Sequence, residues 1–196
     1  MMDIEFKLLF SGLAITLAFV AFVPYIRSIL QGRTRPHVFS WFIWGITTVI
    51  VFFAQLEADG GVGAWPIGVS GVITVAVAVL AFIKRADISI TRTDWTFFAA
   101  ALASLPFWYL TSDPLWTVVV LSVVDLFGFG PTIRKAYVFP HQESQLFFFS
   151  LALRNGFAIL ALESYSVTTV LFPLSITLAC TVLLTMVAYR RRIVLA

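Results

Sequence analysis

The chain has little of what enzymes and secreted domains use for their chemistry. Only one cysteine and two histidines occur among its 196 residues, so an intrachain disulfide is excluded and no zinc-ligand spacing exists. There is no glycine-rich nucleotide loop, and nothing resembles a Ser/His/Asp or paired-carboxylate site. We therefore expect that the protein is not an enzyme and that it binds no cofactor or metal ion.

Charged residues are also scarce. They make up 12% of the chain against 60% hydrophobic residues, and the mean hydropathy is +0.98, which is typical of an integral membrane protein. The apolar runs lack the ten-residue alternation of membrane β-barrels, so the spans are predicted to be helices. The N-terminal segment, with Asp3 and Glu5, lacks the positive leader of a signal peptide, and its helix is expected to be retained. Seven spans are predicted, at about residues 6–30, 38–57, 64–83, 94–111, 114–138, 144–162 and 166–189.

The few charges are sorted by sign. Eleven of the thirteen Lys and Arg residues fall in or beside alternate connections and after the last span. Six acidic residues and Lys7 lie on the opposite side. The positive-inside rule predicts an outside N-terminus and a cytoplasmic C-terminus, in a multi-pass protein of the cytoplasmic (inner) membrane. The net charge of +3 then reflects topology, and no nucleic-acid partner is expected.

Scarce residue types recur in order along the chain. Pro24 and Arg27 reappear 107 positions later as Pro131 and Arg134. The same offset relates Pro66 to Pro173, Ser70 to Thr177 and Thr74 to Thr181. Because prolines and charges are rare here, we interpret the recurrence as a duplication. It predicts a first bundle of three helices (residues 1–85), a linker helix that restores the orientation (86–113) and a second bundle of three (114–196).

This 3+1+3 parallel repeat, with a proline near the cytoplasmic end of the first helix of each bundle, resembles the SWEET and PQ-loop transporter superfamily. The chain looks like a distant, bacterial-type seven-helix member, because the motif reads Pro24-Tyr25 and Pro131-Thr132 where the family pattern has Pro-Gln. The resemblance implies a small-solute transporter or facilitator that works by alternating access. Its substrate would be a sugar, an amino acid or a vitamin-like small molecule, and its other partners the lipid bilayer and further copies of the chain.

Four prolines are predicted to interrupt spans in repeat-matched pairs: Pro24, Pro66, Pro131 and Pro173. Proline removes a helical hydrogen-bond donor, and the freed carbonyl persists only where protein or a water-filled cavity satisfies it. The resemblance implies that these prolines are hinges. Fixed kinks are the alternative, because proline is common in membrane helices.

Two ionisable residues, Asp125 and Arg154, are predicted to lie about 15 Å deep in spans five and six. Because these spans are consecutive and antiparallel, we expect both side chains to face inward near the midplane and to interact. The pair would suit a zwitterionic solute, or Asp125 would couple transport to protons. A structural ion pair that clamps the two spans is the alternative.

Small polar residues form a second candidate set for substrate binding. Ser70 and Thr74 share one helix face, as do Thr177 and Thr181, because each pair is four residues apart. A pseudo-twofold axis would turn both pairs toward the central pocket that the resemblance implies, and Asn155 is a further candidate. The alternative is that these hydroxyls bond to the carbonyl four residues earlier or join helices together.

An aromatic face is predicted on span two, where His37, Trp41 and Trp44 fall at helical spacing. Trp44 lies deep enough to stack on a substrate ring, whereas Trp41 suits the aromatic belt at the cytoplasmic boundary. His37 and His141 both begin their helices, which favours a role in organising the helix entries over a proton relay.

A membrane scaffold or accessory subunit that does not transport is the second functional hypothesis. Twenty phenylalanines suit helix or lipid packing as well as they suit a pocket. A hydrated polar centre that reaches Ser70 and Thr177 would favour transport, and a centre sealed by Phe and Leu would favour the scaffold.

Overall fold

The computed structural model describes residues 3–32, 36, 38–84, 92–138, 140–142 and 145–193. Every regular element in these ranges is helical: α1 (Ile4–Leu30), α2 (Val38–Glu57), α3 (Trp65–Ile83), α4 (Arg92–Thr111), α5 (Leu115–Val138), α6 (Gln145–Leu160) and α7 (Val167–Ile193), with one-turn 3₁₀ helices η1 (Gly61–Gly63) and η2 (Pro140–Gln142). Each α-helix coincides with one predicted span to within four residues, which confirms the all-α prediction. The predicted roles of His37 and of the Pro131 side chain lie outside the described part of the chain.

Three helical segments are long and apolar enough to cross a membrane, namely Ile4–Leu30, Gly61–Ile83 and Val167–Ile193. Shorter apolar helices run from Trp41 to Glu57, from Leu115 to Phe127 and from Gln145 to Leu160. Composition and length together therefore support a membrane-associated helical protein.

Side-chain caps fix where two of the helices begin. Before α7, the Ser166 and Thr169 hydroxyls each accept a hydrogen bond from the other residue's backbone N–H, at 2.9 and 3.2 Å. This reciprocal arrangement satisfies two of the donors that a helix N-terminus leaves free. Before α5, the Asp113 carboxylate accepts from the Leu115 N–H at 2.9 Å. Both helices thus start where the apolar run starts.

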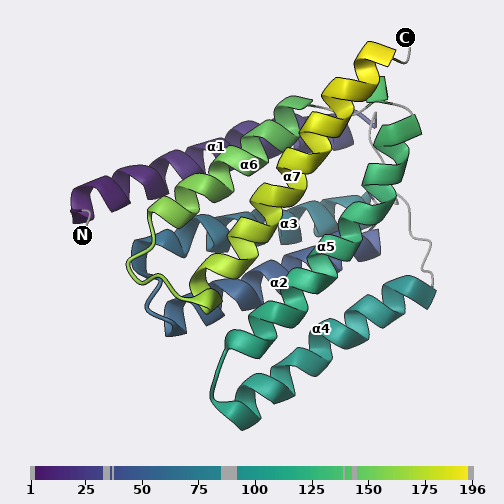
Figure 1. Ribbon diagram of the computed structural model, residues 1–196. Helices are drawn as coiled ribbons and strands as arrows, with labels where there is room; N and C mark the ends of the chain where they lie inside the picture. Colours follow the sequence, from purple (N-terminus) through teal and green to yellow (C-terminus); the bar gives the residue numbers. More distant parts are fainter. Residues whose placement is uncertain are drawn as a thin grey trace.

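The helices form two bundles of three in which the last helix lies in the middle. In the first bundle α3 packs against both α1 and α2, and in the second α7 packs against both α5 and α6. Figure 1 shows α7 lying across the molecule between α6 and α5. The order of packing is therefore 1-3-2 in one half and 5-7-6 in the other.

The two bundles meet through corresponding helices. α1 packs against α6 and α2 against α5, and these two contacts exchange if α1 corresponds to α5 and α2 to α6. The smaller contacts of α3 with α6 and of α7 with α2 exchange in the same way. α4 lies to one side, against α5 and α2 (Figure 1). The contacts of the two bundles thus correspond to one another.

An apolar core runs through both bundles. Its buried members include Val51, Ala54 and Ile67 from the first bundle and Leu121, Phe172, Ile176 and Cys180 from the second. A second cluster joins α1, α2 and α3 through residues such as Ala18, Phe22, Trp41 and Val77. Phe147 and Leu151 of α6 pack against both clusters, so α6 connects the two halves.

The prolines do not occupy equivalent places in their helices. Pro24 and Pro173 lie inside α1 and α7, as predicted. Pro66 lies in the first turn of α3, where proline removes no helical hydrogen bond. The expectation that Pro66 interrupts a span was therefore wrong, because the helix begins at Trp65, one residue before it. Pro106 lies inside α4, outside the repeat.

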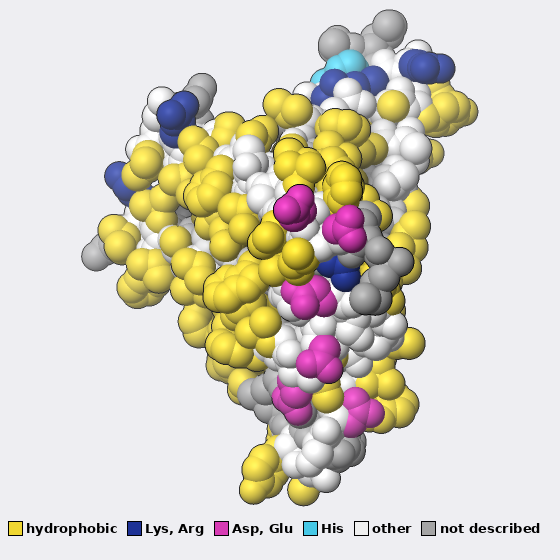
Figure 2. Space-filling model, turned by 90° about the vertical axis from the view of Figure 1, so that its left-hand side faces the viewer, with side chains coloured by type: hydrophobic (Ala, Val, Ile, Leu, Met, Phe, Trp, Pro, Cys, Tyr) yellow, Lys and Arg dark blue, Asp and Glu magenta, His cyan; other side chains and the backbone are white. Residues whose placement is uncertain are grey.

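Acidic and basic side chains occupy opposite ends of the helices. Asp and Glu side chains gather on the face that Figure 2 shows, which includes the start of α1 and the connection between α6 and α7. The three arginines Arg190, Arg191 and Arg192 form the last turn of α7, at the other end. These acidic side chains and the α7 arginines therefore lie at opposite ends, and Lys7 lies at the acidic end.

Candidate functional site

Asp125 lies in the contact between α5 and α2. Its side chain is 7% exposed, and its Oδ1 accepts a hydrogen bond from the Thr47 hydroxyl at 3.1 Å. The same hydroxyl lies 3.0 Å from the Trp44 carbonyl oxygen, so its single hydrogen is shared between two acceptors. Ser122, one turn earlier on α5, is also buried, and its Oγ has no hydrogen-bond partner among the described residues.

Arg154 lies on α6 and is only 3% exposed. Its Nη2 donates to the Asn155 Oδ1 at 2.9 Å, and the Asn155 Nδ2 donates to the Leu151 carbonyl at 2.8 Å. The Arg154 Nε and Nη1 have no hydrogen-bond partner in the part of the chain that the structure describes. The guanidinium is thus held by Asn155, and most of its N–H donors have no partner among the described residues.

Asp125 and Arg154 do not pair in this conformation, contrary to expectation. Asp125 bonds to Thr47 and Arg154 to Asn155, and no ion pair joins them within the described residues. The cause is the packing order: α7 lies between α5 and α6, so consecutive spans are not neighbours. Both residues are buried as predicted, but on different sides of α7.

The two pairs of small polar residues have different surroundings. Ser70 and Thr74 are buried in α3, whereas Thr181 is exposed on α7. Three of the four hydroxyls donate to the carbonyl four residues earlier: Thr74 to Ser70, Thr177 to Pro173 and Thr181 to Thr177. The expected convergence on one central pocket is therefore absent for Thr181, and the helix-bonding alternative describes these three hydroxyls.

Trp44 belongs to an aromatic cluster that joins both bundles. We use this name for Phe22, Tyr25, Trp41, Trp44, Phe147 and Phe148. Tyr25 of α1 stacks on Trp41 at 5.0 Å between ring centroids and lies 6.0 Å from Phe147 of α6. Trp44 meets Trp41 edge-on at 5.7 Å, so its ring packs on protein in this conformation. Tyr25 and Phe147 were missed by the sequence analysis, although Tyr25 directly follows Pro24.

The acidic end is held by a loop clasp, which we define as Lys7, Ser11, Gly60, Val62 and Glu163. The Glu163 Oε1 accepts from the Val62 N–H at 2.9 Å, and the Glu163 N–H donates to the Gly60 carbonyl at 3.1 Å. From α1, the Ser11 hydroxyl donates to the Val62 carbonyl at 2.7 Å and Lys7 Nζ to the Glu163 carbonyl at 3.4 Å. Nearby, Gln55 Nε2 donates to the Thr169 carbonyl at 2.6 Å. The connections α2–α3 and α6–α7 are thus bound to each other.

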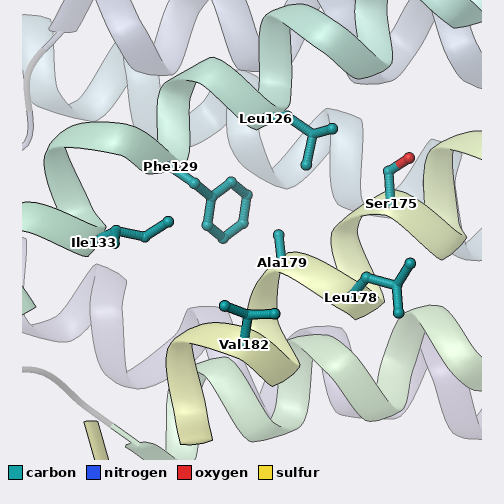
Figure 3. Close-up of a pocket in the computed structure, with 7 residues that line it drawn as sticks. All are labelled: Leu126, Phe129, Ile133, Ser175, Leu178, Ala179 and Val182. Atoms are coloured by element: carbon teal, nitrogen blue, oxygen red, sulfur yellow. The ribbon is translucent and has the colours of Figure 1, made fainter. Parts of the chain in front are cut away.

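A shallow pocket of about 320 Å³ lies between α5 and α7. In Figure 3, residues Leu126, Phe129 and Ile133 of α5 face residues of α7 across it, namely Ser175, Leu178, Ala179 and Val182. Leu178 and Val182 are more than half exposed, so the pocket opens to the surface of the molecule. It contains none of the predicted substrate-binding residues and differs from the expected central pocket.

Across the described ranges, His, Cys, Asp and Glu do not gather in a group of three that could hold a metal ion. The buried polar residues therefore have to be interpreted from their own hydrogen bonds and surroundings. In comparisons with known proteins, no protein-family model, no curated protein and no solved structure matches this chain.

Proposed function

We propose that the protein is a small-solute transporter or facilitator of the SWEET and PQ-loop type. The observation that carries this proposal is the pair of corresponding three-helix bundles with a buried carboxyl, Asp125, and a buried guanidinium, Arg154, near their contacts. Ionisable groups inside a membrane helix bundle are costly and are usually retained for function. The substrate would be a sugar, an amino acid or a vitamin-like small molecule.

The proposed topology has seven spans in the cytoplasmic membrane, with the N-terminus outside. The opposite ends of the helices differ in charge: acidic residues such as Glu163 lie at one end and the Arg190–Arg192 run lies at the other. Such sorting agrees with a cytoplasmic basic end. The loop clasp would then face outside, and the aromatic cluster would lie toward the cytoplasm.

Alternating access would use the loop clasp and the aromatic cluster as its two gates. Each of them connects the first bundle to the second, and each lies toward one end of the helices. In the present conformation both contacts are made, so buried groups such as Asn155 are closed off from either side. Opening one end at a time requires one set of contacts to break while the other persists.

The scaffold hypothesis is favoured by one observation, the apolar core that continues through both bundles. Ile67 and Ile176 are buried in this core, near the places where a hydrated centre was expected. A protein that only has to bind partners in the bilayer would keep such a core permanently closed. The two hypotheses therefore differ in whether the loop clasp has to open.

The test is uptake by purified protein in liposomes, with a panel of labelled sugars, amino acids and nucleosides. A double variant, Val62→Cys with Glu163→Cys, joins the α2–α3 connection to the α6–α7 connection, so oxidation can lock the clasp between the bundles, and mobility on a gel reports whether the disulfide forms. A transporter would take up at least one solute, stop on oxidation and recover on reduction. No uptake of any solute, or uptake unaffected by the formed disulfide, would contradict alternating access at this end.

A further inference from the structure

The Arg154 guanidinium has most of its hydrogen-bonding capacity free. A guanidinium carries five N–H donors in a fixed plane. One of the two on Nη2 is used by Asn155, while Nε and Nη1 have no partner among the described residues. Nη2 takes part in both two-donor edges of the group, one with Nε and one with Nη1. Whichever Nη2 hydrogen Asn155 accepts, one complete two-donor edge stays open.

The guanidinium is held in place by its neighbour. Asn155 is fully buried and uses both ends of its amide, because Oδ1 accepts from Arg154 and Nδ2 donates to the Leu151 carbonyl. These bonds fix the amide orientation against the helix backbone. Asn155 is therefore a positioning residue for Arg154, and the open edge is presented by a constrained side chain.

No acidic side chain in the described ranges forms an ion pair with Arg154. Asp125, the one buried acidic residue among those described, bonds to Thr47 on the other side of α7 and forms no ion pair with Arg154. An arginine stays cationic in proteins, and a buried cation without a partner is strongly unfavourable. An anion from outside the chain would remove this cost.

We propose that Arg154 binds the carboxylate of a solute, an inference that rests on the proposed transport function and narrows its substrate class. A carboxylate is planar, carries one negative charge and matches a two-donor guanidinium edge with two parallel hydrogen bonds. A neutral sugar would leave the cation uncompensated, and a phosphate dianion would leave an excess negative charge beside a single arginine. The substrate is therefore a monocarboxylic or amino acid.

The test compares each carboxylate with the corresponding amide, in which an uncharged carboxamide replaces the carboxylate group, on the purified protein in detergent. The probes are acetate, propionate and alanine, their amides and chloride, measured by calorimetry and thermal shift. The carboxylates bind about ten- to a hundredfold more tightly than the amides, as the loss of charge-assisted hydrogen bonds predicts. Equal binding of acid and amide, equal binding of chloride or no binding of any carboxylate would overturn the proposal.

The variants separate this site from general cationic attraction. Arg154→Lys keeps the charge but loses the two-donor edge, and it weakens carboxylate binding about tenfold or more. Arg192→Gln, a change at an exposed arginine of the α7 terminus, leaves binding unchanged. Unchanged binding in a folded Arg154→Lys protein would refute the assignment. If that variant does not fold, the acid–amide comparison on the unaltered chain decides.

Failure of this inference and failure of the transport function give different results. Uptake of neutral solutes without any carboxylate binding overturns the carboxylate site and leaves the transporter in place. Carboxylate binding that depends on Arg154, without uptake of any carboxylate, leaves the site in place and overturns transport.

Discussion

At the scale of single residues, the hydroxyl of Thr47 is the one donor that the described residues provide to the Asp125 carboxyl. Both residues are buried, so the interaction forms away from water. A buried acceptor that loses its donor keeps the full cost of its desolvation. Thr47 therefore determines how well α5 tolerates Asp125 in contact with α2.

Replacing Thr47 by Val should lower the free energy of unfolding by about 1–3 kcal/mol, because the buried carboxyl loses its donor at nearly constant volume. The measurement is chemical unfolding in detergent. Thr48→Val, at the neighbouring buried threonine, is the matched control and should cost less. In an Asp125→Ala background the effect of Thr47→Val should largely disappear, and an equal effect in both backgrounds would show that the hydrogen bond does not matter.

At the scale of elements, α2 and α3 pack closely because glycines remove side chains from their contact. A Cβ atom built on Gly45 would lie 2.7 Å from the Val75 Cγ2, and one on Gly71 would lie 2.9 Å from the Val49 Cγ2. Real Cβ atoms do not approach other atoms so closely without displacement of the neighbour. These glycines set the distance between the two helices.

Gly71→Ala should destabilise the protein by about 1–3 kcal/mol, since an added methyl group forces α2 and α3 apart. Gly12→Ala is the control on an open helix surface, with no atom within 4 Å of the added Cβ, and it should stabilise by about 0.5–1 kcal/mol through helix propensity. Thermal unfolding of both variants measures the difference. Equal stability of the two variants would mean that the α2–α3 contact relaxes freely.

The helices themselves were predictable, because long apolar runs end at prolines and charges and a bilayer leaves only the helix as an option. The burial of Asp125 and Arg154 also followed from their depth in the sequence. Their separation did not, because sequence order does not reveal that α7 lies between α5 and α6. The repeat predicted which residues correspond but not how each helix is rotated, and Thr181 is exposed where Thr74 is buried.

The loop clasp was the least predictable part of the candidate site. It depends on backbone groups of Gly60 and Val62 that carry no signal in the side-chain pattern. In the sequence, Glu163 was only one of six acidic residues on the side opposite the basic ones. The turn that brings Gly61 beside Glu163 needs a positive φ of 58°, which glycine adopts readily.

At the scale of the whole molecule, Cys180 reports on opening because it is the only cysteine and is fully buried. Glu163→Ala removes the acceptor of the Val62 N–H and should favour opening of the acidic end. The rate of Cys180 modification by a small, charged thiol reagent should rise about tenfold if that hydrogen bond contributes about 1.4 kcal/mol.

Mass spectrometry of the modified protein measures this rate. Glu5→Ala changes another acidic residue at the same end and should leave the rate near that of the unaltered protein. Glu163→Gln retains an oxygen acceptor and should lie in between. A rate that is the same in all four proteins would mean that the clasp does not control access to the centre.

The position of the third helix in each bundle has a consequence for biosynthesis. α3 packs between α1 and α2, and α7 between α5 and α6, so the helix made last in each bundle holds the first two together. While α7 is still in the ribosome, α6 has no α7 to pack against. The second half of the protein therefore assembles only after synthesis is nearly complete, and nascent chains that stall before residue 167 should be targets for membrane proteases.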